Sequence, residues 1–535
     1  MFWLSVLLSV AVALFAIFPL TDTDIWWHLA CAREWVATWT PVREPVVNVH
    51  EYFQQIVAFV YDVGGAPLLV AFKALLWGVV FAFFLRGEKC RNLMAFAFFA
   101  VLLFVFRYQF EIRPVLFSLL FLGIYWNLLP GLFSINAGVR GTSSAEWRES
   151  SRKGTISKSR LFASAAIVLA IQWLWCKFQG LYILGPLFAL LVFVSEWMGC
   201  HGSAKADAPS ARKILVIQAV FVVLLFSMPF LHNDGLNLFL YPFGLLDRLL
   251  GLSPSATIFA SEIAENRSPI TLLLNGENVL QSAVMLVLCA FGLWHAYRLL
   301  RLCCLSWRKA ECRVAISRPL VLGVSFLVTA ILSLVAERNF VLFLPVFFAV
   351  GIKCMPWSCP CKHARDAQST LLPNFLFPSA NRQLPTFYFL LPTLLIAFTL
   401  GLWARSLAFY DRSMVAYQRV PVAATQWMLE NPHSGRIFND DRAGGYLAFM
   451  NPSDSTYIDG RFILKTADFF ERYLEYAKMP QFFLRDADSL EIDRVVLPLR
   501  YYARWDKLIE SLDSHENWHV AYRDSFFVVM DRTGH

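Results

Sequence analysis

Long apolar runs occupy most of the first 404 residues, and they constrain the fold more than any other feature of the chain. A transmembrane helix needs about 20 mostly apolar residues to cross a bilayer. Composition agrees, because 57% of the 535 residues are hydrophobic and only 16% are charged, which is unlike a soluble protein. We therefore predict a mainly α, polytopic membrane protein with about 11 transmembrane helices, in residues 2–20, 66–85, 93–106, 115–133, 161–177, 181–199, 214–231, 279–297, 319–335, 340–352 and 386–404.

The first run has the length of a signal peptide as well as that of a membrane span. Its AVALFA stretch offers small residues for cleavage, but no basic stretch precedes the apolar residues. A signal peptide normally begins with such a basic region. We interpret residues 2–20 as a retained span.

Basic residues indicate the orientation of the chain, because Lys and Arg accumulate in short cytoplasmic loops. If the N-terminus is cytoplasmic, 22 basic residues fall in cytoplasmic loops and 8 in the opposite loops. This asymmetry predicts a multi-pass protein of the cell membrane with a cytoplasmic N-terminus. It also accounts for the net charge of +8 without a nucleic acid as partner.

The C-terminal tail, residues 405–535, is more polar than the rest of the chain. Helix-like segments (PVAATQWMLENP, TADFFERYLEYAKM and YYARWDKLIESLDSH) alternate there with short strand-like runs (GRIFND, STYIDGR, DRVVLPL, WHVAYRD and FFVVMD). Such alternation is typical of an α/β domain. The sequence thus predicts a transmembrane domain at 1–404 and an extracytoplasmic α/β domain at 405–535.

The first outer loop, residues 21–65, combines charged and aromatic residues in an unusual way. It begins with TDTDIWWHLACAREW, and apolar residues recur at helical spacing from Asp24 to Trp39 and again from His50 to Gly65. We expect two helices lying on the membrane surface. Taken alone, Trp26 and Trp27 fit membrane-interface anchors, and Asp22 and Asp24 fit helix caps.

Taken together, these elements resemble the GT-C superfamily of membrane glycosyltransferases. DTDIWWHLACAREW, a Pro-containing linker and HEYFQQ are similar to a bacterial branch with a D-x-D-x-W-W-H-L start and a later H-E-W-like element. That branch also carries Arg-Pro before the fourth span, matched by EIRP, and GGYL and IDGR elements in the tail, matched by GGYLAF and YIDGR. One departure is Tyr52, which stands where the branch usually has Trp.

The resemblance implies a GT-C-like fold and transfer of a sugar from a polyprenyl-phosphate-type lipid donor to an extracytoplasmic acceptor. The partners it implies are this lipid-linked donor and the membrane lipids. Two alternatives stay open: a transporter or flippase, and a non-catalytic scaffold that binds glycan or lipid. The charges favour the enzyme over the transporter, because apart from Lys73 they lie at the outer ends of the predicted spans.

Sugar transfer needs a carboxylate that takes the acceptor proton or holds a metal. Asp24 is the first candidate for this catalytic role and Asp22 the second. His28, one helical turn after Asp24, could orient that carboxylate or share a metal. His50 and Glu51 could complete the site as substrate-binding residues, and the sequence leaves open whether a divalent metal is a cofactor.

The departing phosphate needs cations, and three stand at the outer ends of the predicted spans. These substrate-binding candidates are Arg113, Lys177 and Arg338. Unpaired cations near a bilayer are functional candidates, whereas snorkelling to head groups is the common alternative. Glu111 and Glu337 are near enough in sequence to pair with Arg113 and Arg338, and Lys177 has no such neighbour.

The charge asymmetry predicts the side of the membrane on which each segment lies. A reporter fused after Arg152 should be cytoplasmic, and one fused at His535 should be extracytoplasmic. Paired alkaline phosphatase and green fluorescent protein fusions measure this. Finding both positions on one side would contradict a model with an odd number of spans.

Overall fold

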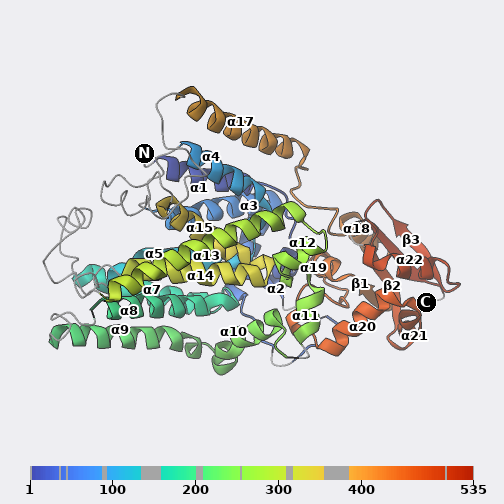
Figure 1. Ribbon diagram of the computed structural model, residues 1–535. Coiled ribbons are helices and arrows are strands. Elements are labelled where there is room, and N and C mark those ends of the chain that lie inside the picture. The colour runs from blue at the N-terminus through green and yellow to red at the C-terminus, as the bar shows by residue number, and fades with distance from the viewer. Residues whose placement is uncertain are drawn as a thin grey trace.

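The computed structural model describes residues 3–34, 38–43, 46–86, 93–133, 158–200, 209–253, 256–308, 317–354, 385–500 and 503–533. A bundle of long helices forms one part of the molecule, and a small sheet with its own helices lies at one end of it (Figure 1). The bundle helices are α1 (Trp3–Phe15), α3 (Glu51–Phe84), α4 (Leu93–Val105), α5 (Pro114–Leu132), α7 (Lys158–Trp175), α8 (Leu184–Cys200), α9 (Pro209–Ser227), α13 (Val279–Arg308), α14 (Ser317–Val335), α15 (Phe340–Cys354) and α17 (Pro385–Phe409).

Every apolar run predicted as a span falls on one of these helices. Within the described residues, 7 helices are long and apolar enough to cross a membrane, and α1, α4 and α7 contribute shorter apolar helices. The chain is therefore a membrane protein with several apolar helices. The number of 11 spans is not confirmed.

Helix α15 lies in the middle of the bundle. All its side chains from Phe340 to Ile352 are buried, and it packs against α14, α3 and α13. Its phenylalanines stack on neighbouring rings, for example Phe343 on Phe326 at 5.4 Å between ring centroids. A helix that is apolar all round is expected at such a place.

The first outer loop forms two helices, as predicted, but the first of them is not a surface helix. Helix α2 (Asp24–Arg33) buries 7 of its 10 residues. Trp26 is fully buried, and its ring lies 4.8 Å from that of Tyr446. The interpretation of Trp26 and Trp27 as interface anchors is therefore wrong, because protein rather than lipid covers both rings.

The second predicted helix continues directly into the next span as α3. The two halves meet at a kink, where Gly64 and Gly65 leave the helical conformation. Gly65 has φ +65°, a backbone angle that favours glycine. The kink lets the first half of α3 belong to the loop and the second half to the bundle.

The C-terminal part contains a four-stranded sheet in the order β1-β2-β4-β3. Strand β1 (Arg436–Asn439) pairs in parallel with β2 (Ile492–Pro498), and β4 (Phe527–Arg532) is antiparallel to both β2 and β3 (Trp518–Arg523). Every residue of β2 is buried, because it lies inside the sheet with apolar clusters on both faces. The surrounding helices are α18 (Val422–Glu430), α19 (Asp441–Met450), α20 (Ala467–Lys478), α21 (Pro480–Ser489) and α22 (Asp506–Asp513).

Four of the five predicted strands form this sheet, and the prediction of a strand at STYIDGR is wrong. Residues 455–461 form a loop instead. Asn439 holds it, since its side-chain oxygen accepts from the backbone N–H of Tyr457 (2.8 Å) and its amide donates to the carbonyl of Ile458 (2.7 Å). Side-chain hydrogen bonds thus replace a strand ladder here.

The described residues between α9 and α13 form three short helices and two 3-10 turns. They include α10 (Gly235–Leu250), α11 (Thr257–Glu262) and α12 (Pro269–Leu274). Phe259 of α11 stacks on Phe470 of α20, with ring centroids 5.1 Å apart. The bundle end that holds Asp22, Asp24 and this segment is called the site end below.

Candidate functional site

The first outer loop and the C-terminal part meet in a close helix contact between α2 and α19. A Cβ atom added at Gly445 would lie only 2.9 Å from the backbone nitrogen of Trp27. At Gly444 the same atom would collide with the carbonyl oxygen of Ile458. The two glycines of GGYLAF are therefore needed for close backbone approach.

The IDGR element also lies against α2. A Cβ atom on Gly460 would collide with Oδ1 of Asp24, and the indole nitrogen of Trp27 would be 3.3 Å away. The carboxyl group of Asp24 thus lies directly against the backbone of a residue more than 400 positions later.

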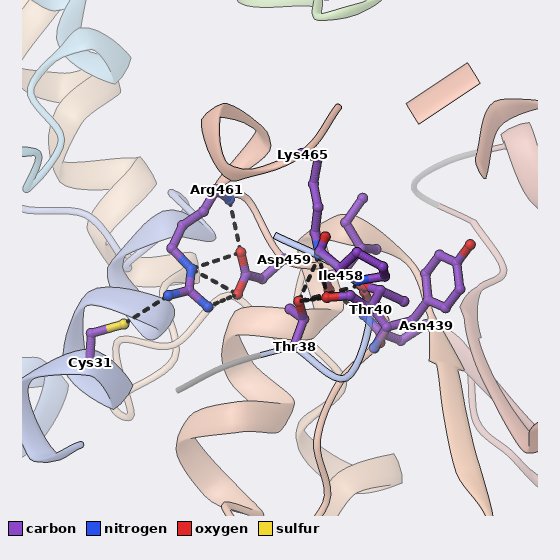
Figure 2. Close-up of polar contacts among 10 residues, drawn as sticks. Cys31, Thr38, Thr40, Asn439, Ile458, Asp459, Arg461 and Lys465 are labelled. Carbon is purple, nitrogen blue, oxygen red and sulfur yellow. Dashed lines mark hydrogen bonds and ion pairs between the residues drawn. The ribbon is translucent and has the colours of Figure 1, made fainter. Parts of the chain in front are cut away.

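Two buried cations fix this loop of the C-terminal part, as Figure 2 shows. Arg461 pairs with Asp459 at 2.5 Å and donates to Sγ of Cys31 in α2 at 3.3 Å. Lys465 donates to the hydroxyl oxygens of Thr38 and Thr40, each at 2.7 Å. Asp459 and Arg461 therefore form a structural ion pair rather than an open polar site.

Asp22 and Asp24 have different surroundings, although only Thr23 separates them. Both oxygens of Asp22 accept from Arg113, at 2.6 and 3.1 Å, and Oδ1 also accepts from the backbone N–H of Asp24. Asp24 forms no ion pair with the described residues. Burial, together with the negative charge of Asp22, raises the pKa of Asp24 to about 8, against the opposing effect of Arg113.

Arg113 bridges two acidic residues that are far apart in the sequence. Besides Asp22, it binds both oxygens of Glu265, at 2.7 and 2.8 Å. Glu265 lies in the turn after α11, so this ion pair attaches the α10–α12 segment to the site end. Sequence proximity does not reveal this partner, because Arg113 and Glu265 are 152 positions apart.

The expected pairing of Glu111 with Arg113 is wrong, because Glu111 faces the bundle. Its carboxylate accepts from the hydroxyl of Thr21 and lies 3.7 Å from the ammonium of Lys73. Lys73 is fully buried and also donates to the carbonyl of Phe18 at 3.1 Å. This pair holds the short connection between α1 and α2, directly before Asp22.

Arg338 differs from the other two candidate cations. It is half-buried in the turn between α14 and α15, and with the residues that the structure describes it forms neither a hydrogen bond nor an ion pair. Burial lowers the pKa of Arg338, while Glu265 and Asp24 act in the opposite direction and Arg113 reinforces the decrease. Arg338 is thus a cation without an ion-pair partner among the described residues, within electrostatic range of Glu265 and Asp24.

Lys177 has two acidic partners that sequence proximity did not reveal. Its ammonium lies 2.5 Å from Asp234 and 3.3 Å from Glu51. His50 is fastened to the same segment, with Nδ1 3.3 Å from the carbonyl oxygen of Phe178. Lys177, His50 and Glu51 therefore form a second cluster, which joins the start of α3 to the start of α10.

His28 is buried close to both groups of charged residues, the one around Arg113 and the one around Lys177. Its ring is 3.5 Å from that of Trp27 and 5.2 Å from that of His50, measured between centroids. Burial lowers its pKa well below the usual value, which favours the neutral form of the ring. Its Nδ1 atom is buried without a hydrogen-bond partner in the described chain, and His28 does not orient Asp24 by a hydrogen bond.

A metal centre would need several acidic, histidine or cysteine side chains to converge. Among the described ranges, no three His, Cys, Asp or Glu side chains come together as metal ligands. Asp22 is already engaged by Arg113, and His28 makes no contact with Asp24 of hydrogen-bond length.

Comparison with known proteins gives a fold but no relative by sequence. No family model matches the chain, and no curated protein does. Among solved structures, the oligosaccharyltransferase AglB of Archaeoglobus fulgidus, determined with an inhibitory peptide and a dolichol-phosphate, aligns with a TM-score of 0.54 over 99% of this chain and 74% of that chain, at 12% identity. An apo structure of an oligosaccharyltransferase from the same organism aligns with a TM-score of 0.51 over 94% of this chain and 70% of that one, at 14% identity.

The chain has a GT-C-like fold. This confirms the fold class that the first loop and the tail suggested. The resemblance to a particular bacterial branch stays a prediction, because no sequence comparison supports it.

The surroundings of Lys177 and Arg338 predict opposite effects of their substitution on the stability of the protein. Lys177→Met should lower the free energy of unfolding by on the order of 1 kcal/mol, and with it the melting temperature of the purified protein. The loss is small because both carboxylate partners are partly exposed and such pairs contribute little each. Arg338→Met should leave the melting temperature unchanged or raise it, because the substitution removes a half-buried charge that lacks an ion-pair partner among the described residues. Tryptophan fluorescence during heating in detergent measures both. A large destabilisation by Arg338→Met, with none by Lys177→Met, would contradict these pairings.

Proposed function

We propose that the protein is a membrane glycosyltransferase that moves a sugar from a polyprenyl-phosphate-type lipid donor to an acceptor on the extracytoplasmic side. The GT-C-like fold supports the reaction class. The observation that carries the proposal is the placement of Asp24, a carboxyl group of raised pKa, near Arg338, a cation without an ion-pair partner among the described residues. A base and a phosphate-binding cation are the two groups that this reaction needs.

Asp24 is the proposed general base. In its ionised form it takes the proton of the acceptor hydroxyl while that oxygen forms a bond to the anomeric carbon. The bond between that carbon and the phosphate oxygen breaks, and its electron pair leaves with the lipid phosphate. A base of pKa near the working pH combines sufficient ionisation with a strong tendency to accept the proton.

Arg338 is the proposed partner of the donor phosphate. An anionic phosphate would supply the direct ion-pair partner that this guanidinium does not have among the described residues, and the arginine fork suits phosphate oxygens. Solved structures with this fold include one that holds a dolichol-phosphate, which supports a lipid phosphate as ligand. Arg113 has a different proposed role: bound by Asp22 and Glu265, it holds the site together.

The roles proposed from sequence for Lys177, His50 and Glu51 change accordingly. Their ion pair and hydrogen bonds join α3 to α10, so we propose that they support the site rather than bind the donor. His28 remains a neutral group packed beside the site, and Asp22 orients Arg113 instead of acting as a second base.

Asp24→Asn tests the catalytic role, because it keeps the size of the side chain while removing its charge. We expect sugar transfer to fall by about 10² to 10⁴, the usual contribution of a general base. Because a base acts in its ionised form, wild-type transfer should rise as the pH increases through about 8. Transfer in membrane vesicles over a pH series, with amounts of protein matched by blotting, measures both effects.

Asp62→Asn is the matched control, since Asp62 is an exposed carboxylate that pairs only with Arg33 among the described residues. It should retain full transfer. If Asp24→Asn also retains full transfer, or if the pH dependence survives in that variant, Asp24 is not the base.

A further inference from the structure

Helix α10 exposes a continuous apolar stripe that the proposed reaction does not use. Leu236, Leu240, Phe243, Leu246 and Leu250 are all exposed, with 59% exposure at Leu236 and 54% at Phe243. Their spacing of three or four residues places them on one face of the helix. Single exposed apolar side chains are common, but a stripe along sixteen residues marks an interaction surface.

The opposite face of α10 is fastened to the bundle. Leu238 is buried, and its carbonyl accepts from the hydroxyl of Tyr182 at 2.5 Å. Tyr241 packs so closely on Gly180 that a Cβ atom there would lie 2.7 Å from its ring. Asp234, just before the helix, forms the ion pair with Lys177. These contacts fix which face points outward.

The exposed stripe is continuous with a membrane-facing surface. The preceding segment, Arg212–Leu231, has a mean hydropathy of 2.6, and 28% of it is buried inside the protein. Its last residues, Phe230 and Leu231, are 51% and 68% exposed, and they lead into α10 through a short turn. Figure 1 shows α10 following the end of α9 on the side of the molecule that carries the sheet.

We propose that α10 is an interfacial helix whose apolar stripe lies among the acyl chains of the leaflet at the site end. A helix with one apolar face and one face held by polar contacts is suited to lie at the boundary between head groups and chains. The occupant is bilayer lipid, because the stripe extends the apolar surface of a helix that is itself long and apolar enough to span the membrane.

The position of α10 connects the membrane with the site. The chain runs from α10 through α11 to Glu265, which binds Arg113. At its other end, α10 is held by the pair of Asp234 and Lys177. The membrane would thereby fix one side of the segment that covers Arg113, a role that does not depend on the proposed sugar transfer.

The test uses the full-length protein in nanodiscs of phosphatidylcholine that contain a phosphatidylcholine with a photoactivatable diazirine in its acyl chain. After illumination and digestion, mass spectrometry locates the lipid adducts. We expect adducts on Leu240 and Phe243 at a yield similar to that on Val220 and Val223 of α9. Helix α22, which is exposed in the C-terminal part, should carry background labelling only.

Two substitutions in α10 test whether the lipid adducts depend on its apolar stripe. Phe243→Glu places a charge in the stripe and should abolish adducts on α10, whereas Asn237→Glu changes an exposed polar position of the same helix and should leave them. If either variant fails to fold, the wild-type adduct map still decides. Background labelling of α10 in the presence of labelled α9 would overturn the proposal.

Discussion

The close contact between α2 and α19 is the constraint on which the rest of the site depends. Helices approach to backbone distance only where side chains are absent, and Gly445 provides that absence opposite Trp27. Once α19 is docked, Trp26 is covered by Tyr446 and Phe449, and Gly460 is brought against Asp24. The burial that raises the pKa of Asp24 therefore comes largely from a segment more than 400 residues away.

A series of charge pairs leads from the bundle to the site end. Lys73 faces Glu111 inside the bundle, Glu111 accepts from Thr21, and the next residue, Asp22, binds Arg113, which also binds Glu265. Buried charges are costly unless they are paired, so each pair fixes the position of the segment that carries it. Arg338 stands beside this series without a partner in the described chain. Arg338 is proposed as the phosphate ligand because it lacks an ion-pair partner in a region where the neighbouring charges have one.

The sequence predicted the helices of the bundle well, because long apolar runs leave few alternatives in a membrane protein. It also predicted a helix at α2, a helix at the first half of α3 and four strands of the sheet, but not the kink that joins the two halves of α3. It could not predict the pairings. Lys177 and Asp234 are 57 positions apart and Arg113 and Glu265 are 152 apart, so their contact depends on the packing of whole helices. Sequence proximity suggested Glu111 for Arg113 instead, and this was wrong.

Gly444, Gly445 and Gly460 mark close backbone approaches that the sequence alone does not reveal. GGYL and IDGR were recognised as elements of a resemblance, but their physical purpose becomes visible only when α19 lies on α2. STYIDGR is predicted as one of the strand-like runs that alternate with helices in the tail, yet Asn439 and the ion pair of Asp459 with Arg461 hold it as a loop. Tertiary hydrogen bonds outweighed a short local preference.

Docking of α19 on α2 positions Asp24, and the sugar-transfer rate of the Gly445→Ala variant tests this dependence most directly. The added methyl group would lie 2.9 Å from the backbone nitrogen of Trp27, and a misplacement of about 1 Å can reduce a rate by about 10². Gly401→Ala is the control, since a Cβ atom there meets no described atom within 4 Å. The account predicts that Gly445→Ala reaches the membrane in normal amounts but loses transfer by about 10², while Gly401→Ala keeps it. Wild-type transfer by Gly445→Ala would contradict the account.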